Sequence, residues 1–165
     1  MDELGELELD LQPKLLRTLE QRTIRRVGSN KVVPVDVRLI AATNRDLQAE
    51  VREKRFREDL FYRLSVVRFV LPPLRERLDD LPLLVQHFLS KGAFNKGEDG
   101  RPRVRSISDA AVEAMKQYNW PGNVRELHNV VERACAYASA DFIQIDDLPD
   151  HLSGCLLYTS DAADE

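Results

Sequence analysis

Two adjacent acidic side chains near the start of the chain, Asp2 and Glu3, are suited to metal-assisted chemistry. One carboxylate can hold a hydrated Mg²⁺ ion, and the next can orient and deprotonate a water molecule. Asn44 follows an apolar run, where an amide at the polar end of a buried strand can position a water or bind a phosphate. The alternatives without a function are a solvated acidic pair and an asparagine that caps the end of a strand.

Three arginines are candidates for binding phosphate. Arg57 and Arg63 are six residues apart, which on one ideal helix sets them about 120° apart, so they need not share a function. Either could instead form a surface ion pair. Arg125 differs, because Trp120 and Pro121 restrict the turn before it and a new helix begins there. This pattern predicts a guanidinium held in a fixed geometry to bind a phosphate.

The elements that must position these residues differ between the two parts of the chain. Before Pro72 and Pro73, helical and strand patterns alternate, which predicts an α/β fold. We expect a helix over 9–21, a hairpin of strands over 23–27 and 31–35, a strand over 37–42, helices over 46–54 and 56–64, and a strand over 66–71. The apolar run at 37–42 is typical of a strand buried in a parallel sheet.

Beyond the two prolines, the pattern predicts a small all-helical domain with no strand between residues 106 and 138. One helix begins at Asp79 or Asp80, and Ser108 is expected to cap another. Residues 91–105 are rich in glycine and charge, which predicts a solvated loop. The basic run within that loop, Arg101, Arg103 and Arg105, is either a solvated face or a phosphate contact.

Composition excludes several classes of protein. The 165 residues carry a formal net charge of -4 and are 43% hydrophobic, without an apolar run that could span a membrane. The two cysteines, Cys135 and Cys155, lack metal-ligand spacing and favour a reducing, cytoplasmic location. Residues 155–165 resemble the translation of a synthetic sequencing adapter, with a short natural acidic tail as the alternative. A chain that opens directly on the acidic pair is expected to be a fragment.

Taken together, the motifs resemble the AAA+ domain of bacterial sigma-54-dependent transcriptional activators, the NtrC type of enhancer-binding protein. The similarity runs from Asp2 to about Leu152 and is carried by DELGEL with QPKLLRTLEQ, RRVGSNKVVPVDVRLIAATNRDL, FREDLFYRLSVVRFVLPPLRER and YNWPGNVRELHNVVERA. It implies a partial αβα core of the P-loop NTPase type over 1–73, a helical lid over 74–152 and a non-native tail over 153–165.

The resemblance also implies roles for the polar residues, with ATP and Mg²⁺ as cofactors. Asp2 would be the Walker B acid that coordinates Mg²⁺, and Glu3 would be the acid that activates water. Asn44 would be sensor I and Arg125 would be sensor II. Arg57 and Arg63 would be trans-acting arginines, with Arg63 favoured as the arginine finger. The implied partners are the sigma-54 RNA polymerase holoenzyme, other subunits in a hexameric or heptameric ring, and DNA only through a missing C-terminal helix-turn-helix domain, without a membrane.

Two family motifs are missing from this sequence. It contains neither a G-x-x-x-x-G-K-[ST] phosphate loop nor the GAFTGA loop that contacts the sigma factor. We therefore expect no ATP hydrolysis by this chain alone, although the resemblance implies an ATPase that remodels the sigma-54 RNA polymerase closed complex to activate transcription. Two other classes stay open: a non-enzymatic interaction or oligomerisation fragment, and another AAA+ remodeller such as a helicase loader or an unfoldase.

Overall fold

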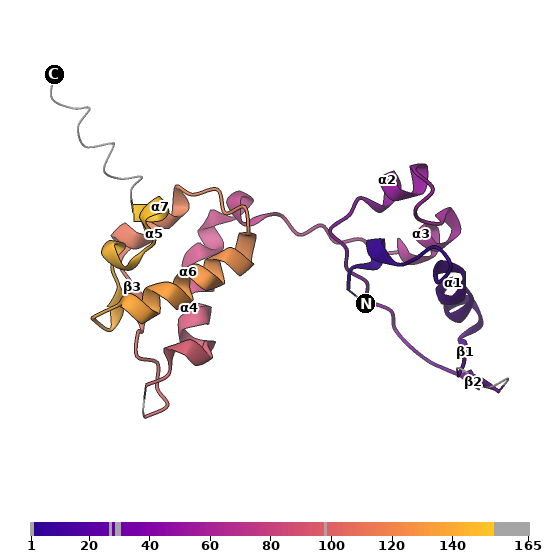
Figure 1. The fold of residues 1–165 in the computed structure, drawn as a ribbon, viewed down its shortest axis with the longest axis horizontal. Coiled ribbons are helices and arrows are strands. Elements are labelled where there is room, and N and C mark those ends of the chain that lie inside the picture. Colours follow the sequence, from indigo (N-terminus) through magenta and orange to yellow (C-terminus); the bar gives the residue numbers. More distant parts are fainter. Residues whose placement is uncertain (1, 27, 29–30, 98, 154–165) are drawn as a thin grey trace, which may run out of the picture. The chain divides into compact units, whose positions relative to one another are not determined.

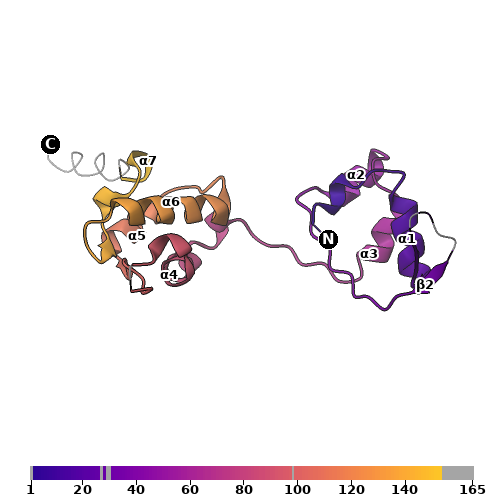
Figure 2. The same ribbon diagram turned by 60° about the horizontal axis from the view of Figure 1, so that its bottom comes forward.

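The computed structural model describes residues 2–26, 28, 31–97 and 99–153, and the chain divides into two compact units between Val70 and Leu71 (Figures 1 and 2). Helices and short strands occur in both units, so the predicted α/β class is confirmed. Apart from Ser153, the tail over 153–165 lies outside the described residues. Among the helices of the described part, none is long and apolar enough to cross a membrane.

Three helices and one 3-10 turn build the first unit around a small apolar core. They are the turn η1 (Leu4–Glu6) and the helices α1 (Gln12–Gln21), α2 (Leu47–Arg52) and α3 (Glu58–Leu64). Leu4, Phe56 and Leu60 are buried and pack against the apolar stripe of α1. Asp46 caps α2, because its carboxylate accepts from the amides of Gln48 and Ala49 in the first helical turn.

The hairpin is confirmed, but two longer predicted strands are not. Strand β1 (Thr23–Arg25) pairs antiparallel with β2 (Val32–Pro34). The predictions of strands over 37–42 and 66–71 were wrong, since neither segment belongs to a sheet of the described residues. Apolarity alone does not make a strand, because the ladder also needs a neighbouring main chain. Most large apolar side chains in the two segments are instead exposed, namely Val37, Ile40, Val66, Val67, Phe69, Val70 and Leu71.

The second unit packs helices around a larger core. Its helices are α4 (Leu81–Lys91), α5 (Asp109–Lys116), α6 (Asn123–Tyr137) and α7 (Asp150–Ser153), with 3-10 turns η2 (Leu74–Glu76), η3 (Leu78–Asp80), η4 (Ala93–Asn95) and η5 (Ile145–Asp147). The core joins one face of α4 to one face of α6, and Trp120 lies fully buried within it. The hydroxyl of Ser108 accepts from the Ala111 amide, so the predicted cap of α5 is confirmed.

One short pair of strands was not expected in this unit. Strand β3 (Ser106–Ile107) pairs in parallel with β4 (Phe142–Ile143), so the expectation that residues 106–138 hold no strand was wrong. The pair is only two residues long, which is too short for an alternating pattern to be visible in the sequence. It ties the segment before α5 to the segment after α6, and the side chain of Ile143 is fully buried beneath it.

The segment over 91–105 is more ordered than the predicted solvated loop. The side-chain amide of Asn95 is buried and donates to the carbonyls of Leu89 and Val104. The guanidinium of Arg103 donates to carbonyls at the end of α6, those of Cys135 and Ala138. A cation at this position satisfies helix carbonyls that lack an internal partner, which glycine and charge content could not indicate.

Candidate functional site

The acidic pair lies at the start of the first unit, against the segment that leads to Asn44. The main-chain amide of Leu4 donates to the carbonyl of Ala42 at 3.0 Å. A Cβ atom on Gly5 would lie 2.7 Å from the hydroxyl of Thr43, so only glycine allows this close approach. The structure thus brings the segments of the acidic pair and of Asn44 side by side, although some 40 residues separate them in sequence.

Both acidic side chains are accessible to solvent. A carboxylate oxygen of Asp2 accepts from the amide of Glu3 at 3.0 Å, and Glu3 adopts a left-handed conformation with φ of 52°. Within the described residues there is no cluster of three or more potential metal ligands. An exposed pair of carboxylates nevertheless suits Mg²⁺, which keeps several waters and usually takes one or two protein carboxylates beside substrate phosphates.

The two candidate arginines of α3 have different partners. Arg57 immediately precedes the helix, and its guanidinium makes two hydrogen bonds to the carboxylate of Asp59, at 3.0 and 2.6 Å. This contact raises the pKa of Arg57 and lowers the pKa of Asp59. Arg63 lies in the last turn and donates at 3.3 Å to the carbonyl of Leu19. Arg63 is therefore the less constrained cation, because its partner is neutral and the bond is long.

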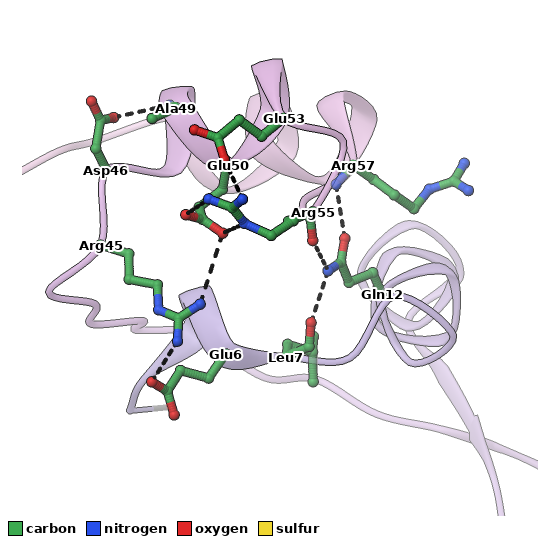
Figure 3. A network of polar contacts seen from close by, with 10 residues as sticks. All are labelled: Glu6, Leu7, Gln12, Arg45, Asp46, Ala49, Glu50, Glu53, Arg55 and Arg57. Carbon is green, nitrogen blue, oxygen red and sulfur yellow. Dashed lines mark hydrogen bonds and ion pairs between the residues drawn. The ribbon is translucent and has the colours of Figure 1, made fainter.

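A buried glutamine joins the acidic and the arginine segments (Figure 3). Gln12 is 0% exposed, and its side-chain nitrogen donates to the carbonyls of Leu7 at 2.8 Å and Arg55 at 3.1 Å. Its side-chain oxygen accepts from the main-chain amide of Arg57 at 2.8 Å. One side chain thereby holds the residues after the acidic pair and the residues that begin α3.

A chain of ion pairs makes a second connection between the same segments (Figure 3). Arg45, the residue after Asn44, contacts Glu6 at 2.9 Å and Glu50 at 3.8 Å. The carboxylate of Glu50 accepts two hydrogen bonds of 2.8 Å from the guanidinium of Arg55. The hydrogen bonds from Arg55 lower the pKa of Glu50, whose side chain is only 10% exposed. The candidate segments are therefore linked by both neutral and ionic contacts.

Reasoning from the sequence missed the residues that make these links. For Gln12 a signal existed, because it begins the i, i+3, i+4, i+7 pattern that Leu15, Leu16 and Leu19 complete. A polar side chain on the apolar face of a helix indicates a buried hydrogen bond. No comparable signal marked Glu50, since one acid among many charged residues has no distinguishing pattern.

In the second unit, a rigid turn presents Arg125 on the first turn of α6. The indole nitrogen of Trp120 donates to the carbonyl of Met115 at 2.9 Å. The amide of Gly122 donates at 2.8 Å to Glu126, and a Cβ on Gly122 would lie 2.7 Å from the Cβ of Glu126. These contacts hold the turn before α6, and Arg125 itself is exposed to solvent.

Two protein families match consecutive parts of this chain. The family described as Sigma-54 interaction domain matches residues 1–70, and the AAA+ ATPase lid domain matches residues 75–162, which includes part of the tail. The two units therefore correspond to part of an AAA+ ATPase module. The chain belongs to the sigma-54-dependent activator family of AAA+ ATPases.

Relatives that match this chain are longer regulatory proteins. Regulatory protein AtoC of Escherichia coli strain K12 is 49% identical over 149 residues, which are 90% of this chain and 32% of AtoC. The DNA-binding transcriptional activator HyfR of the same strain is 53% identical over 137 residues, 81% of this chain and 19% of HyfR. The chain thus spans about a third or less of the curated relatives that it matches.

Solved structures show the same fold. The crystal structure of NtrX from Brucella abortus in complex with ADP matches with a TM-score of 0.74 at 36% identity. The complex of NtrX with ATP matches with a TM-score of 0.73 at 37% identity. Each match covers 92% of this chain and 35% of NtrX.

Proposed function

We propose that this chain forms part of an ATP-dependent sigma-54 interaction domain, which in the full-length protein remodels the sigma-54 RNA polymerase closed complex to activate transcription. The observation that carries the proposal is the joining of three candidate segments within the first unit. Leu4 pairs with Ala42 beside Asn44, and Gln12 bridges the residues that follow the acidic pair to the start of α3. The nucleotide complexes of NtrX support ATP as the ligand.

The acids and Asn44 of the first unit would act on ATP and Mg²⁺ in the full-length protein, where the phosphate loop that this sequence lacks would hold the nucleotide. Asp2 would hold the metal ion, and Glu3 would orient and deprotonate the attacking water. A bound Mg²⁺ supplies neutralisation of the charge that develops on the phosphates. Asn44 is exposed at the end of the segment beside the acids, so its amide can hydrogen-bond a water or a phosphate oxygen.

The arginines act in different ways in this proposal. Arg63 would extend to the nucleotide of the neighbouring subunit in a hexameric or heptameric ring. Its hydrogen bond to the carbonyl of Leu19 is long, so it restrains the guanidinium only weakly. Arg57 supports the same interface but must first be released from Asp59. Arg125 serves as sensor II, and its rigid turn couples bound phosphate to the position of the lid.

We further propose boundaries and partners for the chain. The core covers residues 1–73 and the lid covers 74–152, and the protein works in the cytoplasm on the sigma-54 holoenzyme. Contact with DNA belongs to a helix-turn-helix domain outside this sequence. Positioning and charge neutralisation dominate phosphoryl transfer, so the acids, the amide and the arginines of this chain would supply part of the groups that the reaction needs, beside the phosphate loop that this sequence lacks.

The proposal is tested with the full-length ATPase by substitution and subunit mixing. Arg63→Ala should lower turnover by about 10³- to 10⁵-fold while the same subunit still binds nucleotide. Arg52→Ala is the matched control, because Arg52 is an exposed arginine of α2. Mixing Arg63→Ala with Glu3→Ala subunits should restore activity at sites that pair an intact Glu3 with an intact Arg63. No recovery in rings proven to contain both subunits would place Arg63 in its own subunit's site or in a structural contact.

A further inference from the structure

Gln12 is a buried polar residue whose side chain bonds only to main-chain groups. Its side-chain nitrogen and oxygen make three hydrogen bonds, to Leu7, Arg55 and Arg57, over distances of 2.8 to 3.1 Å. A methionine of similar shape would fill the same volume without the cost of burying an amide. Packing alone therefore does not account for a glutamine at this position. What Gln12 adds is its set of hydrogen bonds to three main-chain groups.

The groups that Gln12 joins are far apart in sequence and close to the proposed chemistry. Leu7 follows the acidic pair by a few residues, whereas Arg55 and Arg57 lie 43 and 45 residues beyond Gln12. The amide of Arg57 precedes α3, where main-chain donors have no partner within the helix. By accepting from this amide, Gln12 fixes the point from which α3 begins, and α3 carries Arg63 in its last turn.

We infer that Gln12 is a positioning residue that couples the acidic segment to the arginine helix of the same subunit. Through this link, the acids that face a subunit's own nucleotide set the position of the arginines offered to its neighbour. The inference rests on the proposed function. The ion pairs of Arg45 with Glu6 and Glu50 connect the same part of the unit. They are partly exposed, so they are weaker restraints than the hydrogen bonds of the buried Gln12 side chain.

The test compares Gln12→Met with Gln48→Met in the full-length ATPase. Gln48 is exposed on α2, so its substitution makes the same chemical change without removing the link. Gln12→Met should lower turnover by about 10- to 100-fold, the size expected when a reacting group is misplaced by about 1 Å. Nucleotide affinity should stay unchanged, because the acids and Arg125 are retained. Gln48→Met should match the unsubstituted protein.

Subunit mixing separates a positioned arginine from a damaged nucleotide site. Gln12→Met subunits keep their own acids, so mixing them with Glu3→Ala subunits should restore activity at sites served by the arginines of the Glu3→Ala subunit. Mixing Gln12→Met with Arg63→Ala should restore none, because neither subunit then offers a well-placed finger. The reverse pattern, or turnover equal to that of Gln48→Met, would overturn the inference.

A second variant covers the case in which Gln12→Met does not fold. Gln12→Glu keeps an acceptor for the Arg57 amide but loses the donor to Leu7 and Arg55, so its turnover should fall less than that of Gln12→Met and its mixing pattern should be the same. Activity of Gln12→Glu equal to that of the unsubstituted protein would contradict the inference. Lack of ATP turnover by the unsubstituted protein would instead refute the proposed function, and the inference with it.

Discussion

The apolar run over 66–70 should make this chain associate with itself. Val66, Val67, Phe69 and Val70 are 68 to 85% exposed, although their composition is that of a buried strand. Burying four such side chains stabilises a complex by roughly 7 kcal/mol per copy, an upper estimate from apolar area. Two copies that cover each other's apolar run would gain about 14 kcal/mol. The loss of translational and rotational freedom on association cancels about half of this gain, and the remaining binding free energy of about 7 kcal/mol corresponds to a dissociation constant of order 10 µM.

Sedimentation velocity over concentrations from about 1 to about 200 µM brackets that constant and should show a shift from monomer to larger species. Phe69→Lys removes the largest side chain of the run and adds a charge, so it should weaken association by more than about 100-fold. Leu83→Lys is the matched control, because Leu83 is a comparably exposed apolar residue on α4, outside the run. The control should associate as the unsubstituted chain does.

Two results would refute this reasoning. A chain that stays monomeric over the whole range would mean that the exposed run is covered in solution. Equal loss of association in Phe69→Lys and Leu83→Lys would mean that added charge, and not removal of this apolar surface, controls the behaviour.

Two further predictions concern acid stability and nucleotide binding. The folded pKa of Glu50 is lowered by Arg55, so its stabilisation is present above the ordinary glutamate pKa of about 4.3 and is lost as pH falls through the folded value. Glu50→Gln should therefore lower the melting temperature at neutral pH but not at pH values below the folded pKa of Glu50. Glu20→Gln, an exposed control on α1, should leave the melting temperature unchanged at both pH values. A melting temperature of Glu50→Gln that is lowered equally in acid and at neutral pH would contradict this. Calorimetry with ATP and Mg²⁺ should show no saturable binding to this chain alone, since the sequence holds no phosphate loop, and a low-micromolar dissociation constant would overturn the assignment.

Local features of the fold were predictable because their causes lie within a few residues. Asp46 and Ser108 cap helices through their own side chains, and the paired strands β1 and β2 are only a few residues apart in the sequence. The strands expected over 37–42 and 66–71 were not formed, because pairing depends on residues distant in sequence. The pairing of β3 with β4 was missed because strands of two residues show no alternating pattern in the sequence.

The amino-acid sequence alone is enough to assign the family and to name the residue types of the proposed site. The motifs that contain Asp2, Glu3, Asn44, Arg63 and Arg125 resemble those of the sigma-54-dependent activators, and the matches to the two family models show the membership. The order of motifs is a property of the sequence and does not depend on folding. No tertiary information was needed to name the class of chemistry or its candidate groups.

How those groups are held depends on tertiary packing. Gln12 bonds to carbonyl and amide groups 5 to 45 residues away, and no local pattern specifies such partners. Likewise, the pairing of Arg57 with Asp59 distinguishes it from Arg63, although both are arginines of one motif. Hydrogen bonds and ion pairs fall off steeply with distance and angle, so their partners are chosen by the packing that brings the atoms together.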